Sequence, residues 1–320
     1  MLEYWICCWG SCGATNGRTR RTMNIAIIGA RGCVGNALIK KLITASEHTV
    51  TASFRREEEP GMRHDQITWK RVNLYDDLGT EEFIEGADVV VYLVHSLAAK
   101  NFRDMDRVFA DRTGRCAHRA GIKKIIYMGG IVPTGGRLSA HLKSRKETGE
   151  QLAKSGVPVA EVRASIILGA CSVSYQMVYW LSKRLPVIIM PKWGVAKCSP
   201  IALEDVIDMI VALIERPITG HELFEIGREQ MRYDELLIKS GMTTRGVANT
   251  IVRIPLFPIA IAAWGVRVIT GVPWRIAAAL IGSLKNDSVV TNDRFHEIVG
   301  RPPQAVDVTL KTLTRTMKKI

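Results

Sequence analysis

The sequence lacks three features that would place the protein in other functional classes. Its apolar runs are shorter than the roughly 20 residues that a membrane-spanning helix needs, including the uncharged stretch from Ile254 to Val266. Its cysteines do not recur in pairs at the spacing of metal ligands, so no metal site is predicted. Its basic residues form no stripe interleaved with aromatic residues, so no nucleic-acid surface is predicted.

Acidic residues are in the minority, since 31 Asp and Glu stand against 44 Lys and Arg, for a formal net charge of +13. Such an excess favours anionic partners, either a phosphorylated cofactor or an acidic membrane face. The hydrophobic content of 47% and the charged content of 23% are typical of a globular protein. The seven cysteines show no pairing by spacing, which predicts a reduced, cytoplasmic protein.

Residues 1–22 fit none of the patterns that follow. The apolar run from Leu2 to Trp9 is too short to span a membrane, and the basic residues come after it, unlike those of a secretory signal. We therefore interpret this segment as a disordered leader or a non-native start, with Met23 as the natural first residue. The expected division is a nucleotide-binding core over 23–170 and a substrate or lid region over 171–320, interleaved with the end of the core.

The strongest signal is a glycine-rich turn that follows a short run of mostly branched apolar residues, 24–28, typical of a buried strand, and precedes a helical pattern and a second predicted strand over 50–54. Gly29 permits a sharp turn, Gly32 lets the backbone approach a phosphate, and Gly35 lets the following amphipathic helix pack on the strand. The helix N-terminus offers unpaired N–H groups and partial positive charge, which predicts a bound pyrophosphate. The expected contacts are Gly29, Arg31, Gly32, Cys33, Val34 and Gly35.

The end of the second strand indicates which dinucleotide binds. Cofactors without a 2′-phosphate are usually held by an acidic residue about 20 residues after the glycines. Arg55 and Arg56 occupy that position, and Arg31 lies within the turn. Guanidinium groups can bind a phosphate bidentately, so we expect NADP(H) to be preferred over NAD(H). The alternative is that Arg55 and Arg56 are solvated, with Glu57 to Glu59 partly neutralising them.

Four later segments predict further strands of one sheet: the alternating stretch 67–72, the continuous apolar run 87–94, and the segments 122–128 and 157–163. The fold class is therefore α/β, a doubly wound parallel sheet of about seven strands with helices on both faces. Ligands of such sheets lie at the carboxyl ends of the strands. Leu93, Val94 and His95 should thus border the cofactor, as should Ala164 and Ile166. His95 has an alternative role as a turn or N-cap residue.

The turn from Gly29 to Gly35 and the stretch GADVVVYLVHSL, residues 86–97, resemble the atypical extended short-chain dehydrogenase/reductases of the NAD(P)H-binding, NmrA-like group. The resemblance runs through nearly the whole chain from Met23. It implies an NAD(P)-binding Rossmann fold with a smaller, mostly helical C-terminal substrate region. It also implies that Asn73 and Leu74 touch the adenine, although the group usually has Asp at the first position.

The resemblance also locates the catalytic positions. Standard short-chain reductases use a Ser after the fifth strand, then a Tyr and a Lys four residues apart on the next helix. The Ser position falls here at Gly129 or Gly130, the Tyr position at His141 and the Lys position at Arg145. Arg145 can hold ribose hydroxyls but exchanges no proton. His141 titrates near neutrality, so it either replaces Tyr as the proton donor or merely caps or packs.

Residues 254–284 predict two apolar helices, over 257–270 and 273–284, with prolines at their starts. One interpretation is a lid that buries its apolar side against a substrate pocket. The other is a peripheral element on the inner membrane face, with Trp264 and Trp274 at headgroup level and nearby arginines on anionic lipid. Residues 288–320 predict a final strand and a basic amphipathic helix.

Two functions follow from these patterns. The first is an NADP(H)-dependent oxidoreductase acting on a hydrophobic carbonyl or quinone-like substrate, which the apolar C-terminal region favours. The second is a non-catalytic NADP(H)-sensing regulator of the NmrA type, which the missing Ser, Tyr and Lys favour. We favour the oxidoreductase.

Overall fold

The computed structural model describes residues 22–54, 62–133, 135, 138–192, 194, 196–255 and 258–318 of the 320. Nearly all of the leader, residues 1–21, lies outside the described residues. Arg55 and Arg56, the expected 2′-phosphate contacts, lie outside them as well.

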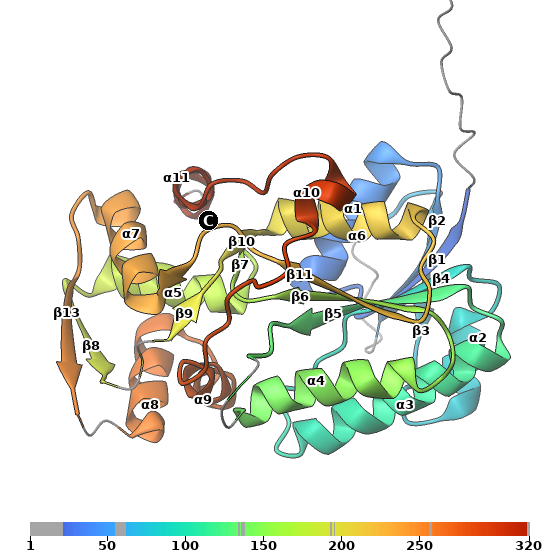
Figure 1. Cartoon of the computed structure of the whole chain (residues 1–320), viewed down its shortest axis with the longest axis horizontal. Helices are drawn as coiled ribbons and strands as arrows, with labels where there is room; N and C mark the ends of the chain where they lie inside the picture. Colours follow the sequence, from blue (N-terminus) through green and yellow to red (C-terminus); the bar gives the residue numbers. More distant parts are fainter. Residues whose placement is uncertain are drawn as a thin grey trace, which may run out of the picture.

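A seven-stranded parallel sheet forms the centre of the molecule, in the order β11-β6-β5-β4-β1-β2-β3 (Figure 1). The central strands are short runs of branched apolar residues that are buried on both faces, which is typical of parallel sheets. This confirms the doubly wound α/β fold that the sequence predicts. The strands are β1 (Asn24–Ile28), β2 (Thr49–Phe54), β3 (Ile67–Arg71), β4 (Val89–Tyr92), β5 (Lys124–Gly130), β6 (Val159–Ala164) and β11 (His221–Ile226).

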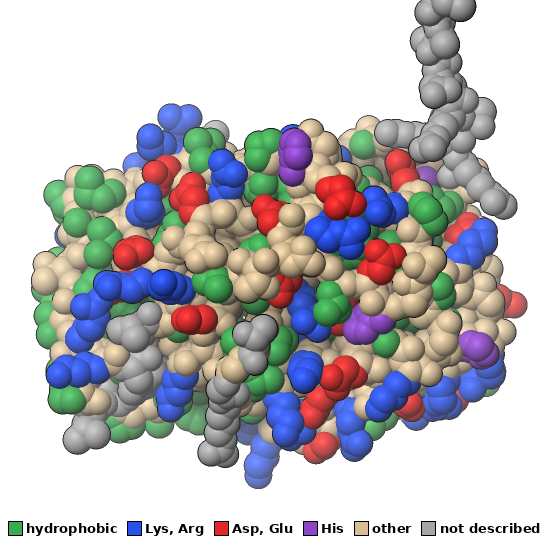
Figure 2. All heavy atoms as spheres, in the orientation of Figure 1, with side chains coloured by type: hydrophobic (Ala, Val, Ile, Leu, Met, Phe, Trp, Pro, Cys, Tyr) green, Lys and Arg blue, Asp and Glu red, His purple; other side chains and the backbone are tan. Residues whose placement is uncertain are grey.

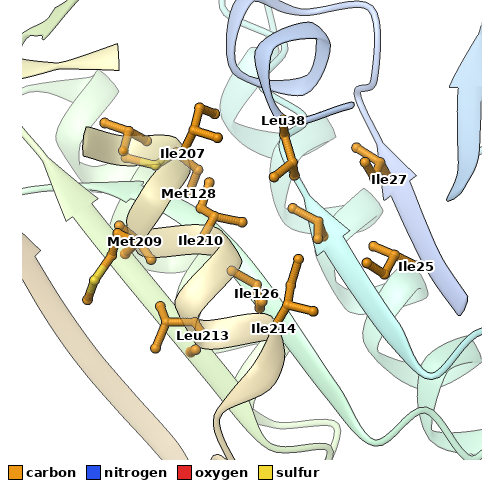
Figure 3. Close-up of a cluster of buried hydrophobic side chains, with 14 of the residues drawn as sticks. Ile25, Ile27, Leu38, Ile126, Met128, Ile207, Met209, Ile210, Leu213 and Ile214 are labelled. Carbon is orange, nitrogen blue, oxygen red and sulfur yellow. The ribbon is translucent and has the colours of Figure 1, made fainter. Parts of the chain in front are cut away.

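Helices cover both faces of the sheet (Figure 1). One face carries α1 (Cys33–Ala45), α6 (Leu203–Glu215) and α10 (Phe295–Val299), and the other carries α2 (Asp77–Ile84), α3 (Phe102–Arg119) and α4 (Ala140–Ala153). Figure 3 shows Ile210 and Leu213 of α6 packed against Ile126 and Met128 of β5. Burial of such side chains stabilises the fold by about 1.5–3 kcal/mol each.

The apolar face of α3 differs from the sequence prediction. The helical pattern of residues 101–119 predicts an apolar face made of Phe102, Met105, Val108 and Phe109. In the structure Val108 is 43% exposed, whereas Asp106 and Thr113 are buried in the same stripe as Phe109. Ala110 and Gly114 are small and bring the helix close to its neighbours. In this orientation of the helix, the carboxylate of Asp106 is buried at the edge of the sheet where the strands have their carboxyl ends.

The C-terminal region is mostly helical and lies beside the sheet (Figure 1). Its helices are α5 (Val173–Arg184), α7 (Tyr233–Arg245), α8 (Ile259–Thr270), α9 (Trp274–Ser283) and α11 (Val306–Met317). Three two-stranded sheets join them: β8 (Val187–Pro191) with β13 (Thr250–Ile254), β7 (Ile167–Leu168) with β10 (Ile201–Ala202), and β9 (Lys197–Cys198) with β12 (Met231–Arg232).

Both expected apolar helices are present as α8 and α9, which begin after Pro258 and Pro273. The expected final strand is absent from residues 288–318, where the chain makes only isolated bridges before α10. The side chain of Glu225 explains this difference, because its carboxylate accepts the backbone N–H groups of Thr291 and Asn292 that a strand would pair. Within the described part of the chain, every helix is too short or too polar to cross a membrane.

Candidate functional site

The glycine-rich turn connects β1 to the N-terminus of α1. Gly29 has a φ of 92°, and a Cβ there would lie 3.1 Å from the carbonyl carbon of Leu93. A Cβ at Gly35 would lie 2.6 Å from the carbonyl oxygen of Gly29, so only glycine allows the helix to start this close to the strand. Gly32 is the N-cap of α1 and has no side chain to cover the first N–H groups of the helix. The turn therefore presents these donors to an anionic ligand.

Ser53 holds this turn, and the sequence analysis missed it. Its hydroxyl accepts hydrogen bonds from the backbone N–H groups of Gly29, at 2.8 Å, and Ala30, at 3.4 Å. Ser53 is 4% exposed and lies near the end of β2, beside the glycines because β1 and β2 are parallel neighbours. The sequence offered no clear signal for this role, because β2 also carries the hydroxyl residues Thr49 and Thr51.

The other expected cofactor contacts lie along the carboxyl edge of the sheet. Leu93 follows β4 and packs against Gly29, and Ala164 ends β6 beside Gly130. Asn73 follows β3, but its amide forms a local turn: it donates to Asp76 at 3.1 Å and accepts from the N–H of Tyr75 at 3.1 Å. The structure thus brings the predicted residues from β1, β3, β4 and β6 to one edge. Their contacts with a dinucleotide remain predictions.

His95 belongs to a buried hydrogen-bond network that the sequence did not reveal. Its Nδ1 lies 2.7 Å from the carboxylate of Asp106, which also accepts from the N–H of Ser96 at 2.8 Å and from the hydroxyl of Ser144 at 2.9 Å. Burial raises the pKa of Asp106, but the hydrogen bond from His95 and those from Ser96 and Ser144 outweigh it and leave the pKa lowered. The ionised carboxylate therefore fixes His95 in the tautomer that donates from Nδ1. Asp106 lies on the same side of the helix as Phe109 and Thr113, but hydrophobic periodicity does not single out a polar residue at that position.

His141 and Arg145 lie one turn apart near the start of α4. The ring of His141 lies 5.1 Å from that of His95, measured between centroids, and its Nδ1 lies 3.1 Å from the hydroxyl of Ser283 on α9. Burial, together with His95 and the cationic Arg145, holds the pKa of His141 well below its usual value. The imidazole is therefore neutral near pH 7. Arg145 lies beside Gly130, one of the two candidate positions for the standard Ser.

A cavity of about 440 Å³ extends from His141 into the C-terminal region. Its apolar walls come from α5, β8, α8 and α9: Met177, Val178, Leu181, Leu185, Val187, Ile188, Ile189, Met190, Ile261, Val266, Ile269, Leu280, Ile281 and Leu284. Among the described residues that line it, the polar side chains are His141, Ser165, Ser174, Tyr233, Ser283 and Ser288. Such a lining suits a mostly apolar ligand that is oriented by a few polar groups.

Three of these polar groups form a hydroxyl cluster. The hydroxyls of Ser165 and Ser288 lie 2.7 Å apart, and that of Tyr233 lies 3.3 Å from Ser288. Burial raises the pKa of Tyr233 to about 12, so its phenol stays protonated at neutral pH. The cluster can donate to a ligand oxygen but supplies no base.

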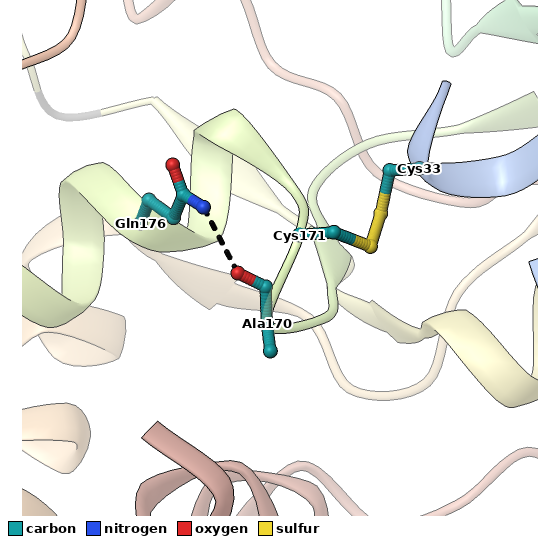
Figure 4. The surroundings of a disulfide bond; sticks show 4 residues. All are labelled: Cys33, Ala170, Cys171 and Gln176. Atoms are coloured by element: carbon teal, nitrogen blue, oxygen red, sulfur yellow. Dashed lines mark hydrogen bonds between the residues drawn. A yellow bond between two sulfur atoms is a disulfide. The ribbon is translucent and has the colours of Figure 1, made fainter. Parts of the chain in front are cut away.

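A disulfide joins Cys33, the first residue of α1, to Cys171 in the loop between β7 and α5 (Figure 4). The expectation of a chain without paired cysteines is therefore wrong. Spacing gave no sign of the pair because 138 residues separate the two positions, and only the fold brings their α-carbons to 5.3 Å. The bond ties the glycine-rich turn to the C-terminal region. Cys116 and Cys198 are buried free thiols.

Comparison with known proteins agrees with this geometry. A family model described as NAD(P)H-binding matches residues 29–164. Residues 29–164 are an NAD(P)H-binding domain. The glycine cradle at the N-terminus of α1 fits that assignment, because the domain leaves the helix N–H groups open where a pyrophosphate would lie. No curated protein matches the sequence.

Solved structures share the fold of this NAD(P)H-binding domain and of the region beyond it. A nucleoside-diphosphate-sugar epimerase from Staphylococcus aureus has a TM-score of 0.73 at 17% identity, over 90% of this chain and 100% of that one. The Citrobacter triphenylmethane reductase, solved with NADP(H), has a TM-score of 0.72 at 17% identity, over 91% and 99%. A UDP-glucose 4-epimerase from Thermotoga maritima has a TM-score of 0.68 at 14% identity, over 93% and 99%. At these identities the likeness shows a common fold.

Proposed function

We propose that the protein is an NADP(H)-dependent oxidoreductase of the atypical extended short-chain type that reduces a hydrophobic carbonyl or quinone-like substrate. The observation that supports the proposal is the apolar cavity, because its lining includes His141, Gly130 and Ala164 at the carboxyl edge of the sheet, where the cofactor is expected. A regulator that only binds a dinucleotide needs no such cavity beside it. The Citrobacter reductase of the same fold binds NADP(H), which agrees with the proposal.

In this proposal the bound NADPH supplies a hydride. His141 hydrogen-bonds the substrate oxygen, and the proton that completes the reduction passes through its ring. Asp106 acts indirectly. It orients His95, whose ring packs beside that of His141. Arg145 donates to ribose hydroxyls and stays charged throughout. The apolar walls orient the remainder of the substrate and exclude water.

The preference for NADPH over NADH is part of the proposal. Arg31 is exposed in the glycine-rich turn, and Arg55 and Arg56 follow β2 in the sequence. If these side chains meet the 2′-phosphate, replacing Arg55 and Arg56 together with Ala should weaken NADPH binding by about 100-fold, at 1.4 kcal/mol per factor of ten, and leave NADH binding nearly unchanged. Calorimetric titration of both cofactors measures this. Equal affinities in the unaltered protein would remove the preference.

A second candidate function is a non-catalytic NADP(H) sensor. It is favoured by Gly129, Gly130, His141 and Arg145, which stand where catalytic reductases have Ser, Tyr and Lys. The low pKa of His141 also favours it, because a neutral imidazole is a weaker acid than an imidazolium ion.

Steady-state oxidation of NADPH against a panel of quinones and aldehydes separates the two functions. The oxidoreductase predicts turnover that falls by about 100-fold in His141→Phe, with little change in NADPH affinity. Arg145→Ala should first weaken NADPH binding. Turnover that is undiminished in His141→Phe would remove this residue from the chemistry. Tight NADPH binding without turnover on any substrate would favour the sensor.

A further inference from the structure

One face of α8 is apolar and exposed. Ile261, Trp264 and Val268 follow the i, i+3, i+7 spacing of one side of a helix, and their exposed fractions are 55%, 63% and 62%. Trp274 of α9 lies beside them, because its indole N–H donates to the carbonyl oxygen of Ala260 at 3.4 Å. We call these four large side chains, Ile261, Trp264, Val268 and Trp274, the α8 face.

An ordinary surface helix turns mostly polar residues toward water, whereas α8 exposes mostly apolar residues and one charged residue, Arg267. Its inner side buries Ala263 and Val266, while the outer side carries a tryptophan and two branched apolar residues. Val187 and Ile189 of β8 and Val252 of β13 are exposed at the same end of the molecule. Apolar exposure gathered over neighbouring elements marks an interaction surface.

The segments that form the α8 face and its neighbouring elements carry basic but no acidic residues, although three of the basic residues pair with acidic residues outside these segments: Arg163 with Glu161, Lys239 with Asp307 and Arg253 with Asp234. The segments 162–203 and 236–286, which supply α5, β8, β13, α8 and α9, contain no Asp or Glu. Their basic residues are Arg163, Lys183, Arg184, Lys192, Lys197, Lys239, Arg245, Arg253, Arg267, Arg275 and Lys285. Arg267 and Arg275 are exposed on the two helices of the α8 face. Figure 2 shows hydrophobic and basic side chains interspersed at the end where β13 and α8 lie.

We propose that this end of the protein docks on the surface of an anionic lipid bilayer, with the α8 face in the headgroup region. Apolar area with tryptophans inserts at the membrane interface, and basic side chains beside it meet lipid phosphates. A second copy of the chain is a poorer occupant. A two-fold interface over the α8 face would bring its basic residues close to the basic residues of the partner's copy of the same surface, and like charges repel.

The cavity opens on this surface. Val187, Ile189 and Ile261 line the cavity and are also exposed, so its mouth lies between β8 and α8. An apolar molecule can therefore pass from the bilayer into the cavity without crossing water. This inference about substrate entry rests on the proposed function. It identifies the substrate class of the oxidoreductase as a membrane-resident lipid with a carbonyl or quinone head.

Co-sedimentation of the full chain with vesicles tests the docking. Vesicles of phosphatidylcholine with about one-third phosphatidylglycerol should bind the protein, pure phosphatidylcholine should bind it weakly, and added salt should weaken the binding. Trp264→Glu with Val268→Glu should lower binding by about tenfold or more, and Arg267→Glu with Arg275→Glu should remove the preference for anionic lipid. Val308→Glu is the matched control, because Val308 is 56% exposed on α11, outside the α8 face.

Three outcomes would overturn the docking: no sedimentation with anionic vesicles, unchanged sedimentation of the Trp264→Glu, Val268→Glu variant, or a dimer in solution that this variant dissociates. Reduction of a short-chain, water-soluble quinone measures the proposed function separately. If that reduction persists while vesicle binding fails, the docking is wrong and the oxidoreductase stands.

Discussion

Ser53 shows how one buried hydroxyl supports the glycine-rich turn. Replacing Ser53 with Ala leaves the N–H of Gly29 without its 2.8 Å acceptor, which should lower the free energy of unfolding by about 1–2 kcal/mol. The less restrained turn should also weaken NADPH binding by about fivefold, measured by calorimetry. Ser46→Ala is the control, because Ser46 bonds to Leu42 at the opposite end of α1. Equal cofactor affinities in both variants would contradict the role of Ser53.

His141 should give the reduction a characteristic pH dependence. Its pKa is lowered, so the protonated fraction is small at pH 7 and grows as the pH falls. If the imidazolium is the proton donor, the rate at saturating NADPH should decrease by up to about tenfold per pH unit above that pKa. His141→Phe should be slow and independent of pH. Arg145→Ala removes a cation that lowers the pKa, so the decline should move to higher pH; a profile identical to that of the unaltered protein would contradict this mechanism.

At the scale of elements, Lys124 joins the sheet to α6. Its ammonium group lies at the start of β5 and donates to the carbonyl oxygens of Leu213, Ile214 and Arg216, at 2.8, 2.6 and 2.5 Å. These carbonyl groups lie at the C-terminal end of α6, where no further helical turn supplies N–H donors for them.

Replacing Lys124 with Met should therefore lower the free energy of unfolding by about 2–4 kcal/mol, because buried carbonyl groups lose their donor. Urea denaturation measures the change. The neighbouring Lys123→Met is a matched control, because Lys123 is exposed and forms a surface ion pair with Asp88, so its loss should cost less than about 1 kcal/mol. Similar costs for both variants would show that Lys124 does not cap α6.

At the scale of the whole molecule, the disulfide between Cys33 and Cys171 links the nucleotide-binding core to the C-terminal region. It closes a segment of 138 residues, and a loop of that size restricts the unfolded chain by up to about 5 kcal/mol. Cys33→Ser, or a reductant added to the unaltered protein, should lower the melting temperature. The reductant should leave the variant unchanged. Identical melting of the unaltered protein with and without reductant would show that the bond does not form in solution.

Short-range patterns in the sequence were enough to predict the sheet and the glycine-rich turn. Both depend on residues close together in the chain: buried strands require short apolar runs, and the turn requires Gly29, Gly32 and Gly35 at fixed spacing. The apolar character of α8 and α9 was equally local. These features do not depend on how a helix is rotated or on the path that the chain takes between elements.

Which distant side chains meet depends on how the helices and the sheet pack together. The rotation of α3, set by packing of its small residues, places Asp106 against His95, and hydrophobic periodicity alone did not distinguish this from the face that included Val108. The pairing of Cys33 with Cys171 and the cavity between β8 and α8 likewise arise from elements far apart in sequence. Such contacts depend on how the layers pack, because each segment alone is compatible with several arrangements.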